Sequence, residues 1–450
     1  MSNEFETILS VEDFTQNTDV LEIIKNLKDN GVHERVFSDI IDNKYQYVDL
    51  VMEGGGVLGI ALVGYTYVLE QMGIRFLGLG GASAGAITTL LLAVYKSIND
   101  SKSEWLLKQL ANQNLYDFVD GGDSSREVIQ EYLNGTSILT ADIFSFFKSI
   151  IHIKDKLGLN AGINFENWLI KILASEDVKI NKLSELIEKR RIIPDLKLRD
   201  GSKPNIVMDD KLVIITADVS TETKVKFPEM TKYYWDNPNE VNPACFVRAS
   251  MSIPIFFEPY YVDNIPDNKY IKDEWVNHLK FTGEVPKKIT FVDGGIMSNF
   301  PINVFHVDPP AIPKCPTFGV RLSKKRSKEN KTNNPINFLS AVFDSARHIY
   351  DFDFLMKNPD YEQLITMIDL ENYNWLNFNM SKEEKIGLFV EGVKAASVFI
   401  QKFKWQAYKE LRGYKPVPTP FIDKIVSDKD IKKASDLVSE ELIDKSNSEQ

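Results

Sequence analysis

The run of residues 76–95 reads FLGLGGASAGAITTLLLAVY and contains no charged side chain. Twenty uncharged residues are enough to cross a bilayer as a helix. Four glycines, however, interrupt the run between residues 78 and 85, and helix interiors disfavour glycine. We therefore expect a short buried strand over Phe76–Leu79 and a buried helix over Ala84–Tyr95, rather than a membrane span.

Ser83 stands between the expected strand and helix, in a Gly-x-Ser-x-Gly pattern that begins at Gly81 and ends at Gly85. This is the pattern of a nucleophile elbow, in which a sharp strand-to-helix turn holds the serine with its hydroxyl exposed. The N-terminus of the helix would direct free N–H groups toward that hydroxyl and favour negative charge there. The pattern alone is a weak signal because it also arises by chance.

A second strand, loop and helix lie just upstream. The run Tyr47–Met52 predicts a strand, the loop that follows contains Gly54-Gly55-Gly56 and Gly59, and Ile60–Met72 predicts a helix. The glycines also match the dinucleotide pattern G-x-G-x-x-G, but the acidic residue required on the next strand is missing. Three consecutive glycines can instead turn backbone N–H groups toward one point, as an oxyanion hole requires.

Three further apolar runs predict buried strands: Lys211–Val219, whose near-continuous apolar pattern is that of a central parallel strand, Lys287–Val292 and Pro316–Leu322. The second of them leads directly into Asp293-Gly294-Gly295. Loops at the ends of neighbouring parallel strands meet at one edge of the sheet, so the glycine loop at residues 54–56 and the turn at Ser83 are expected to converge. Further helices are expected to begin at Asn242, to span residues 335–357, and to span residues 381–411 behind a capping box of Ser381 and Glu384.

The composition excludes several classes of protein. The chain of 450 residues is 43% apolar, as expected of a globular protein, and its net charge of −11 argues against a nucleic-acid binder, which would show a basic face. Two cysteines, Cys245 and Cys315, cannot form a disulfide framework, and the acidic N-terminus does not read as a secretory signal. We expect a cytoplasmic protein with a helical appendage over residues 1–43, a catalytic domain over 44–405 and a charged tail over 406–450.

Four motifs in this order resemble those of the patatin-like phospholipases. They are the loop at residues 54–59, the Ser83 elbow, the segment Val247–Pro254 with Phe257-Glu258-Pro259 behind it, and Asp293-Gly294-Gly295. The resemblance extends over roughly residues 47–403. It implies a three-layer α/β/α fold with a mainly parallel central sheet. It also implies a lipid acyl hydrolase of the phospholipase A or lysophospholipase type.

In that family a Ser–Asp dyad replaces the usual triad, with no catalytic metal or cofactor. The resemblance therefore implies Ser83 as nucleophile and Asp293 as base. The N–H groups of Gly54, Gly55 and Gly56 would form the oxyanion hole, and the remaining motif glycines are Gly59, Gly81, Gly85, Gly294 and Gly295. The chain departs from the family at Leu58, where a Lys or Arg is usual. That departure puts in doubt any electrostatic help near the hole or at a phosphate head group.

A histidine-based mechanism is the competing hypothesis, because histidine is the usual base of acyl transfer at neutral pH. None of the five histidines adjoins a motif, and His306 and His348 are the candidates for a Ser–His–Asp triad. A carboxylate with a pKa near ~4 is a weak base, although a water-poor site can raise that pKa. A protein with the same fold but a silent site is the second alternative.

The implied substrate is a membrane phospholipid or another acyl lipid, so transient contact with a membrane surface is expected. Residues 321–331 carry six basic side chains and form either a solvated loop or an electrostatic contact with anionic lipid. Some members of the family are inactive until a small molecule or a protein activates them. The segment Met1–Asn43 and the tail after Phe403 are candidates for such regulation.

Overall fold

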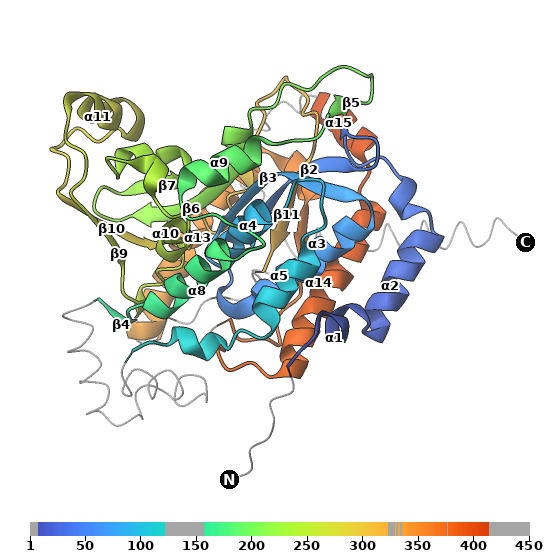
Figure 1. Cartoon of the computed structure of the whole chain (residues 1–450), viewed down its shortest axis with the longest axis horizontal. Helices are drawn as coiled ribbons and strands as arrows, with labels where there is room; N and C mark the ends of the chain where they lie inside the picture. Colours follow the sequence, from blue (N-terminus) through green and yellow to red (C-terminus); the bar gives the residue numbers. More distant parts are fainter. Residues whose placement is uncertain are drawn as a thin grey trace, which may run out of the picture. The chain divides into compact units, whose positions relative to one another are not determined.

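The computed structural model describes residues 8–121, 157–322, 329, 332–333, 335–375 and 377–413 (Figure 1). Most of the basic segment and the tail beyond Gly413 lie outside these residues. In the described part of the chain, no helix is both long and apolar enough to cross a membrane. The uncharged run instead forms the strand β3, Ile74–Ala82, and the helix α4, Ala84–Val94, as expected.

A mostly parallel sheet forms the middle of the protein, with the strand order β12-β11-β2-β3-β6-β10-β9. Its five parallel strands are β2 (Gln46–Met52), β3, β6 (Leu212–Asp218), β11 (Thr317–Arg321) and β12 (Ile365–Met367). Antiparallel strands extend it: β10 (Lys288–Asp293), β9 (Tyr260–Asp263), β7 (Thr223–Phe227), β1 (Ile40–Ile41) and β5 (Lys197–Leu198). The short strands β4 (Gly158–Asn160) and β8 (Ile255–Phe257) pair separately.

Helices cover both faces of this sheet, which gives the expected three layers. One layer contains α3 (Gly59–Gln71), α4, α5 (Ser103–Ala111), α10 (Ala244–Ser250) and α14 (Lys382–Lys402). The opposite layer contains α12 (Gly295–Ser298), the short helix η8 (Ile302–Phe305) and α13 (Pro335–Lys357). Glycines in β3 let helices of both layers approach the strand closely. Gly78 and Gly80 face η8 on one side of the sheet, whereas Gly81 faces α4 on the other. Smaller helices complete the fold: α1 (Val11–Thr15), α2 (Thr18–Asp29), α8 (Ile163–Ala174), α9 (Leu183–Arg191), α11 (Lys269–Glu274) and α15 (Trp405–Gly413).

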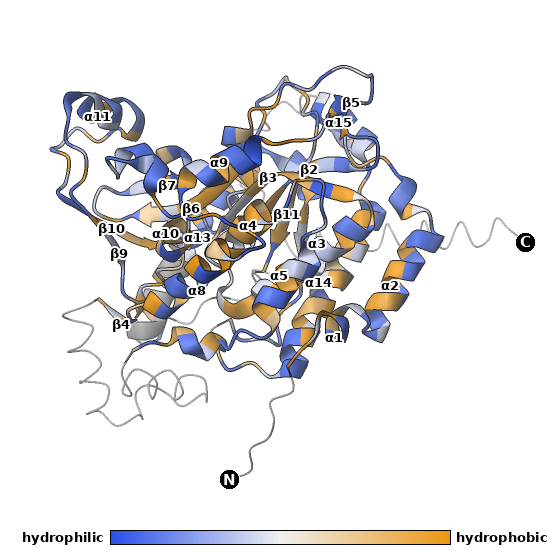
Figure 2. Ribbon diagram, in the orientation of Figure 1, coloured by the Kyte–Doolittle hydropathy of each residue, from blue (hydrophilic) through white to orange (hydrophobic). Residues whose placement is uncertain are grey.

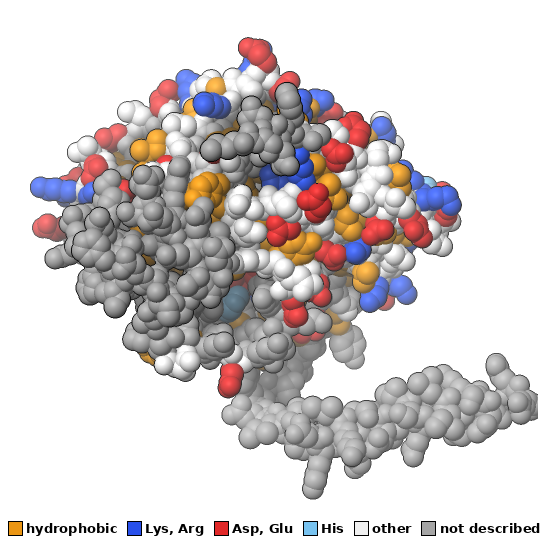
Figure 3. All heavy atoms as spheres, turned by 90° about the horizontal axis from the view of Figure 1, so that it is seen from below, with side chains coloured by type: hydrophobic (Ala, Val, Ile, Leu, Met, Phe, Trp, Pro, Cys, Tyr) orange, Lys and Arg blue, Asp and Glu red, His pale blue; other side chains and the backbone are white. Residues whose placement is uncertain are grey.

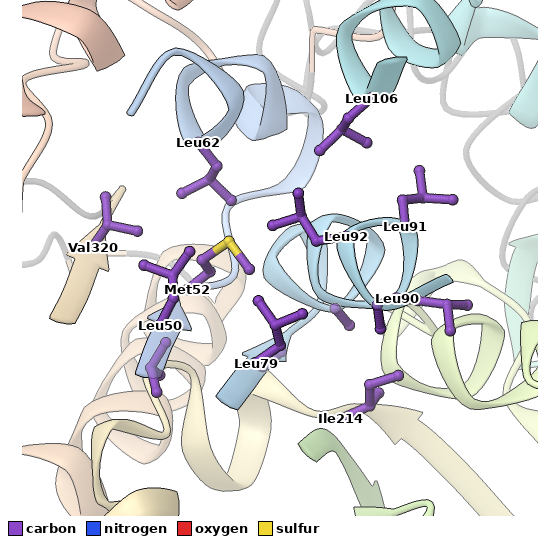
Figure 4. Packing of buried hydrophobic residues seen from close by; sticks show 14 of the residues in the cluster. Leu50, Met52, Leu62, Leu79, Leu90, Leu91, Leu92, Leu106, Ile214 and Val320 are labelled. Carbon is purple, nitrogen blue, oxygen red and sulfur yellow. The ribbon is translucent and has the colours of Figure 1, made fainter. Parts of the chain in front are cut away.

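The hydrophobic core lies between the sheet and the first of these helical layers. Figure 4 shows Met52 and Leu79 from the sheet facing Leu62 of α3 and Leu92 of α4. All four side chains are at most 1% exposed. The surface helices show apolar and polar sides in Figure 2, and on the face in Figure 3 acidic, basic and apolar side chains are interspersed.

The N-terminal helices pack against the rest of the fold. The apolar residues Val20, Ile24 and Leu27 of α2 are buried, and α2 contacts α14. This contact gives α2 a structural role, and the regulatory role stays a prediction. The expected boundaries at residues 43 and 405 also stay predictions.

The prediction of a single helix over residues 381–411 is wrong, because two helices occupy this region. The capping box of Ser381 and Glu384 opens α14 as predicted, but Phe403 is extended and separates α14 from α15. The guanidinium of Arg35 donates to the carbonyls of Ile400, Gln401 and Phe403. Because the last carbonyls of a helix lack internal partners, this arginine stabilises the end of α14.

Candidate active site

Strands β3 and β10 run toward each other along the same edge of β6. Ala82, the last residue of β3, pairs with Ile215, and Asp293, the last residue of β10, pairs with Thr216. Because Ile215 and Thr216 are consecutive, the two strands end against each other. Ser83 follows Ala82 directly, so the sheet register brings Ser83 and Asp293 together from positions 210 residues apart in the chain.

The backbone of Ser83 has the sharp turn expected of a nucleophile elbow. Its φ is 50° and its ψ is −121°, values that residues other than glycine rarely adopt. Such a conformation costs on the order of 1–3 kcal/mol and persists only where the surroundings enforce it. The motif glycines allow the turn: a Cβ on Gly81 would lie 2.5 Å from Gly85, and one on Gly85 would lie 2.2 Å from the carbonyl oxygen of Met52.

Two serines in the segment Val247–Pro254 support this turn. Ser250 Oγ accepts a hydrogen bond from the N–H of Ser83 at 2.9 Å and donates to the carbonyl of Ile215 at 2.6 Å. The carbonyl of Ser252 accepts from the N–H of Asp293 at 2.8 Å. This segment is one of the four motifs, but its sequence alone indicates no role for these two serines. The structure shows that they connect the two halves of the candidate dyad.

The hydroxyl of Ser83 is buried, which corrects the expectation of an exposed hydroxyl. Ser83 is only 2% exposed, and its Oγ donates to the sulfur of Met251 at 3.3 Å. Met251 follows α10 and is itself buried, so its side chain covers the serine. A thioether is a weak acceptor, and this contact constrains the hydroxyl only weakly.

Asp293 is a buried carboxylate with one partnered oxygen. Its Oδ1 accepts from the N–H of Gly295 at 2.7 Å, while its Oδ2 is buried and has no hydrogen-bond partner in the part of the chain that the structure describes. Burial raises the pKa of Asp293 above its ordinary value. The positive charge of Arg347 and the nearby hydroxyl of Ser83 oppose that increase in pKa. A Cβ on Gly294 would lie 2.0 Å from the carbonyl oxygen of Ile215, so glycine is required there.

The glycine loop lies beside Ser83. A Cβ on Gly54 would lie 2.8 Å from the Cβ of Ser83, and Gly56 has a φ of +57°, which favours glycine. The N–H of Gly54 donates to the carbonyl of Asn299 at 3.0 Å, whereas the N–H groups of Gly55 and Gly56 have no partner among the described residues. Gly59 begins α3, and nothing within 4 Å would meet a Cβ there.

His306 interacts with a different group of side chains. Its Nδ1 lies 2.8 Å from the hydroxyl of Tyr361, and its ring packs edge-on against Phe354. Burial lowers the pKa of His306 below its ordinary value. His348 lies on α13 and is half-buried.

Two residues at this site, Asn299 and Arg347, were not predicted from the sequence. Asn299 follows α12 and bonds to the glycine loop, and Arg347 on α13 donates to its side chain. Asn299 stands six residues after Asp293, and this spacing from the aspartate motif was a signal that could have found it. Nothing in the sequence around Arg347 distinguishes it from a surface arginine.

Two known proteins align with most of the chain. It is 27% identical over 361 residues to the uncharacterized protein YqhO of Bacillus subtilis (strain 168), an alignment that covers 80% of this chain and 100% of YqhO. The crystal structure of VipD from Legionella pneumophila aligns with a TM-score of 0.35 and 15% identity, over 82% of this chain and 70% of VipD. Residues 50–306, more than half of the chain, match the patatin-like phospholipase family. The four motifs and the mostly parallel α/β/α sheet agree with that match, and the chain belongs to the patatin-like phospholipase family.

Proposed function

We propose that this protein is a lipid acyl hydrolase that cleaves carboxylic esters of membrane lipids through a dyad of Ser83 and Asp293. The meeting of β3 and β10 along β6 carries the proposal, because it brings a strained, buried serine next to a buried carboxylate. The unpartnered Oδ2 of Asp293 is the natural acceptor for the serine proton. Catalytic hydrogen bonds are often long or misdirected before substrate binds, so the present contact of Ser83 with Met251 is compatible with this role.

In the first half of the reaction, the hydroxyl of Ser83 turns from Met251 toward Asp293 Oδ2. Asp293 takes the proton as the serine oxygen forms a bond to the ester carbonyl. The resulting tetrahedral intermediate collapses by breaking the bond to the alcohol, which leaves with the proton from Asp293. In the second half, water attacks the acyl-serine, gives its proton to Asp293, and the fatty acid leaves as the proton returns to Ser83. Burial supports these steps because it raises the pKa of Asp293 and makes it a stronger base.

The negative charge of the tetrahedral intermediate needs hydrogen-bond donors that point into the site. The N–H groups of Gly55 and Gly56 fit this role best, because they have no other partner in the described chain. Gly54 has a different part in the proposal, since its own N–H is held by Asn299. Its missing side chain lets the loop lie against Ser83.

A triad through His306 finds less support. Its Nδ1 is engaged with the hydroxyl of Tyr361, and no carboxylate among the described residues makes a hydrogen bond to its Nε2. The carboxylate of Asp308 lies 3.5 Å from Nε2 and is almost fully exposed. The dyad requires no such partner.

We propose that α13 provides contact with a lipid surface. Five large apolar side chains of this helix are strongly exposed: Phe338 (58%), Val342 (48%), Ile349 (66%), Phe352 (49%) and Met356 (49%). Their spacing of four, seven, three and four residues puts them on one face of the helix. The opposite face of α13 carries Arg347, beside Asp293, so a membrane at the outer face would lie about one helix diameter, ~10 Å, from the site. The two cysteines are buried and unpaired, which fits action from the cytoplasmic side.

Hydrolysis of phospholipids with labels at defined acyl positions tests this proposal. We expect fatty acid release by the full chain, and loss of at least a thousandfold in kcat for both Ser83→Ala and Asp293→Asn, as for other acyl-transfer nucleophiles and bases. His306→Ala should retain most of the activity. Equal hydrolysis by Ser83→Ala and the unaltered chain would refute the proposal. Inactivity of the unaltered chain, with and without candidate activators, would instead favour the silent fold.

A further inference from the structure

The side chain of Arg347 reaches the candidate site from outside the region that matches the family. Arg347 lies on α13, 41 residues beyond the end of the match at residue 306. Its Nη2 donates to Asn299 Oδ1 at 2.9 Å, and its Nε lies 3.3 Å from the place where a Cβ on Gly295 would be. The Nε–H is buried and has no partner among the described residues. The guanidinium is therefore held at the turn that carries Asp293.

Asn299 connects this arginine to the glycine loop. Its Nδ2 donates to the carbonyl of Gly54 at 3.1 Å, and its own carbonyl accepts from the N–H of Gly54 at 3.0 Å. With Oδ1 bonded to Arg347, the orientation of the Asn299 amide is fixed. The chain of hydrogen bonds from α13 thus ends at Gly54, whose Cα lies against the nucleophile.

Arg347 also lies close to the other side of the same loop. Its guanidinium carbon is 5.9 Å from the ring centre of Trp375, within the range of a cation–π contact. The carbonyl of Trp375 accepts from the N–H of Val57 at 3.0 Å, and a Cβ on Gly56 would collide with this carbonyl. Asn299 and Trp375 therefore hold the two ends of the segment that contains Gly55 and Gly56.

We propose that Arg347 is the positioning residue of the active site and that it supplies from α13 the positive charge that the glycine loop lacks at Leu58. Leu58 is 4% exposed and belongs to the hydrophobic core, so this position has no place for a cation. Arg347 orients the oxyanion-hole segment through Asn299 and sets the charge beside Asp293. This inference rests on the function proposed above.

The electrostatic part of the role follows from the surroundings of Asp293. Burial raises the pKa of this carboxyl, and Arg347 is the strongest influence that lowers it, ahead of the Ser83 hydroxyl and the Gly295 N–H. Asp351, one turn further along α13, does not face Asp293 but accepts from Ser298 Oγ and the N–H of Phe300. Without Arg347 the carboxyl would hold its proton to higher pH, and a protonated Asp293 cannot act as a base.

Three variants separate the charge of Arg347 from its shape. Arg347→Met removes the charge and the hydrogen bond, Arg347→Lys keeps the charge, and Lys357→Gln removes an exposed cation at the far end of the same helix as a control. The pH dependence of kcat/KM for a short-chain soluble ester is measured for each. The acid limb is the part of the profile in which kcat/KM falls as the pH decreases. In Arg347→Met we expect this limb to move to higher pH by about one unit or more, because a neighbouring opposite charge shifts a carboxyl pKa by that amount. The acid limb should stay in place in Arg347→Lys and in Lys357→Gln.

A second measurement does not depend on catalysis. Hydrogen exchange, followed by mass spectrometry, is compared for the peptide that contains Gly54 and Val57, whose N–H groups donate to the carbonyls of Asn299 and Trp375. We expect this peptide to exchange about tenfold faster in Arg347→Met than in the unaltered chain or in Lys357→Gln, corresponding to the loss of one hydrogen bond of about 1.4 kcal/mol. Unchanged exchange in Arg347→Met would overturn the positioning role. A loss of activity with an unmoved acid limb would overturn the electrostatic role. If the unaltered chain does not hydrolyse esters, the proposed function fails, and exchange alone decides whether Arg347 positions the loop.

Discussion

Ser250→Ala is the most informative single substitution outside the dyad, because Ser250 holds the backbone of the nucleophile without facing a substrate. Its hydroxyl is fully buried and makes two short hydrogen bonds, one from the N–H of Ser83 and one to the carbonyl of Ile215. Alanine keeps the backbone and removes both bonds. The strained φ of Ser83 then loses one of the contacts that enforce it.

The expected loss of stability follows from these two bonds. The N–H of Ser83 would be left buried without an acceptor, at a cost of about 1–3 kcal/mol, and the lost bond to Ile215 adds about 1 kcal/mol. We therefore expect the free energy of unfolding to fall by about 2–4 kcal/mol, a substantial part of the roughly 5–15 kcal/mol typical of a folded protein. The remaining folded molecules should hydrolyse esters at least tenfold more slowly, because the elbow can relax.

Ser103→Ala is the matched control. Ser103 is equally buried, and its hydroxyl bonds to Thr66 at 2.9 Å between α5 and α3. We expect it to lose about 1 kcal/mol and to keep its activity per folded molecule. Urea unfolding gives the stability, and hydrolysis of a soluble ester, corrected for the folded fraction, gives the activity. Equal stability and equal activity of Ser250→Ala and the unaltered chain would show that the hydroxyl of Ser250 does not support the turn at Ser83.

Three further predictions concern Met251, which covers Ser83, the pKa of Asp293, and the contact of α13 with a membrane. Met251→Ala should make Ser83 react several-fold faster with a fluorophosphonate, because the thioether no longer covers it; an unchanged rate would show that Met251 is no barrier. The kcat/KM should fall as pH decreases through the pKa of Asp293, which burial raises above the ordinary value near ~4; a profile that stays level down to pH ~4 would contradict this. The double substitution Phe338→Ser and Ile349→Ser should weaken liposome binding at least fivefold while soluble-ester hydrolysis stays unchanged, and undiminished binding would exclude the outer face of α13 as the contact.

Local features of the site were predictable because each depends on a few adjacent residues. The glycines around Ser83 are required by the close approach of β3, α4 and β2, and this requirement appears in the sequence as Gly-x-Ser-x-Gly. The strand before Asp293 was also predicted, and the family match confirms the resemblance that these motifs carried. Their roles in catalysis stay predictions.

Features that depend on distant parts of the chain were not predictable in this way. The direction of β10 is antiparallel, and only its pairing with β6 shows that Asp293 meets Ser83 end to end. At the break between α14 and α15, the carbonyls at the end of α14 accept hydrogen bonds from Arg35, more than 360 residues upstream. The cover by Met251 and the approach of Arg347 likewise result from tertiary packing, to which no local pattern corresponds.

The most direct test of the dyad is the reaction of the full chain with a fluorophosphonate, followed by mass spectrometry of the modified peptide. We expect one adduct on Ser83, absent from Ser83→Ala and formed at least a hundredfold more slowly in Asp293→Asn, because the serine then lacks its base. An adduct that forms at the same rate in Asp293→Asn, or one located on a residue other than Ser83, would contradict the central claim.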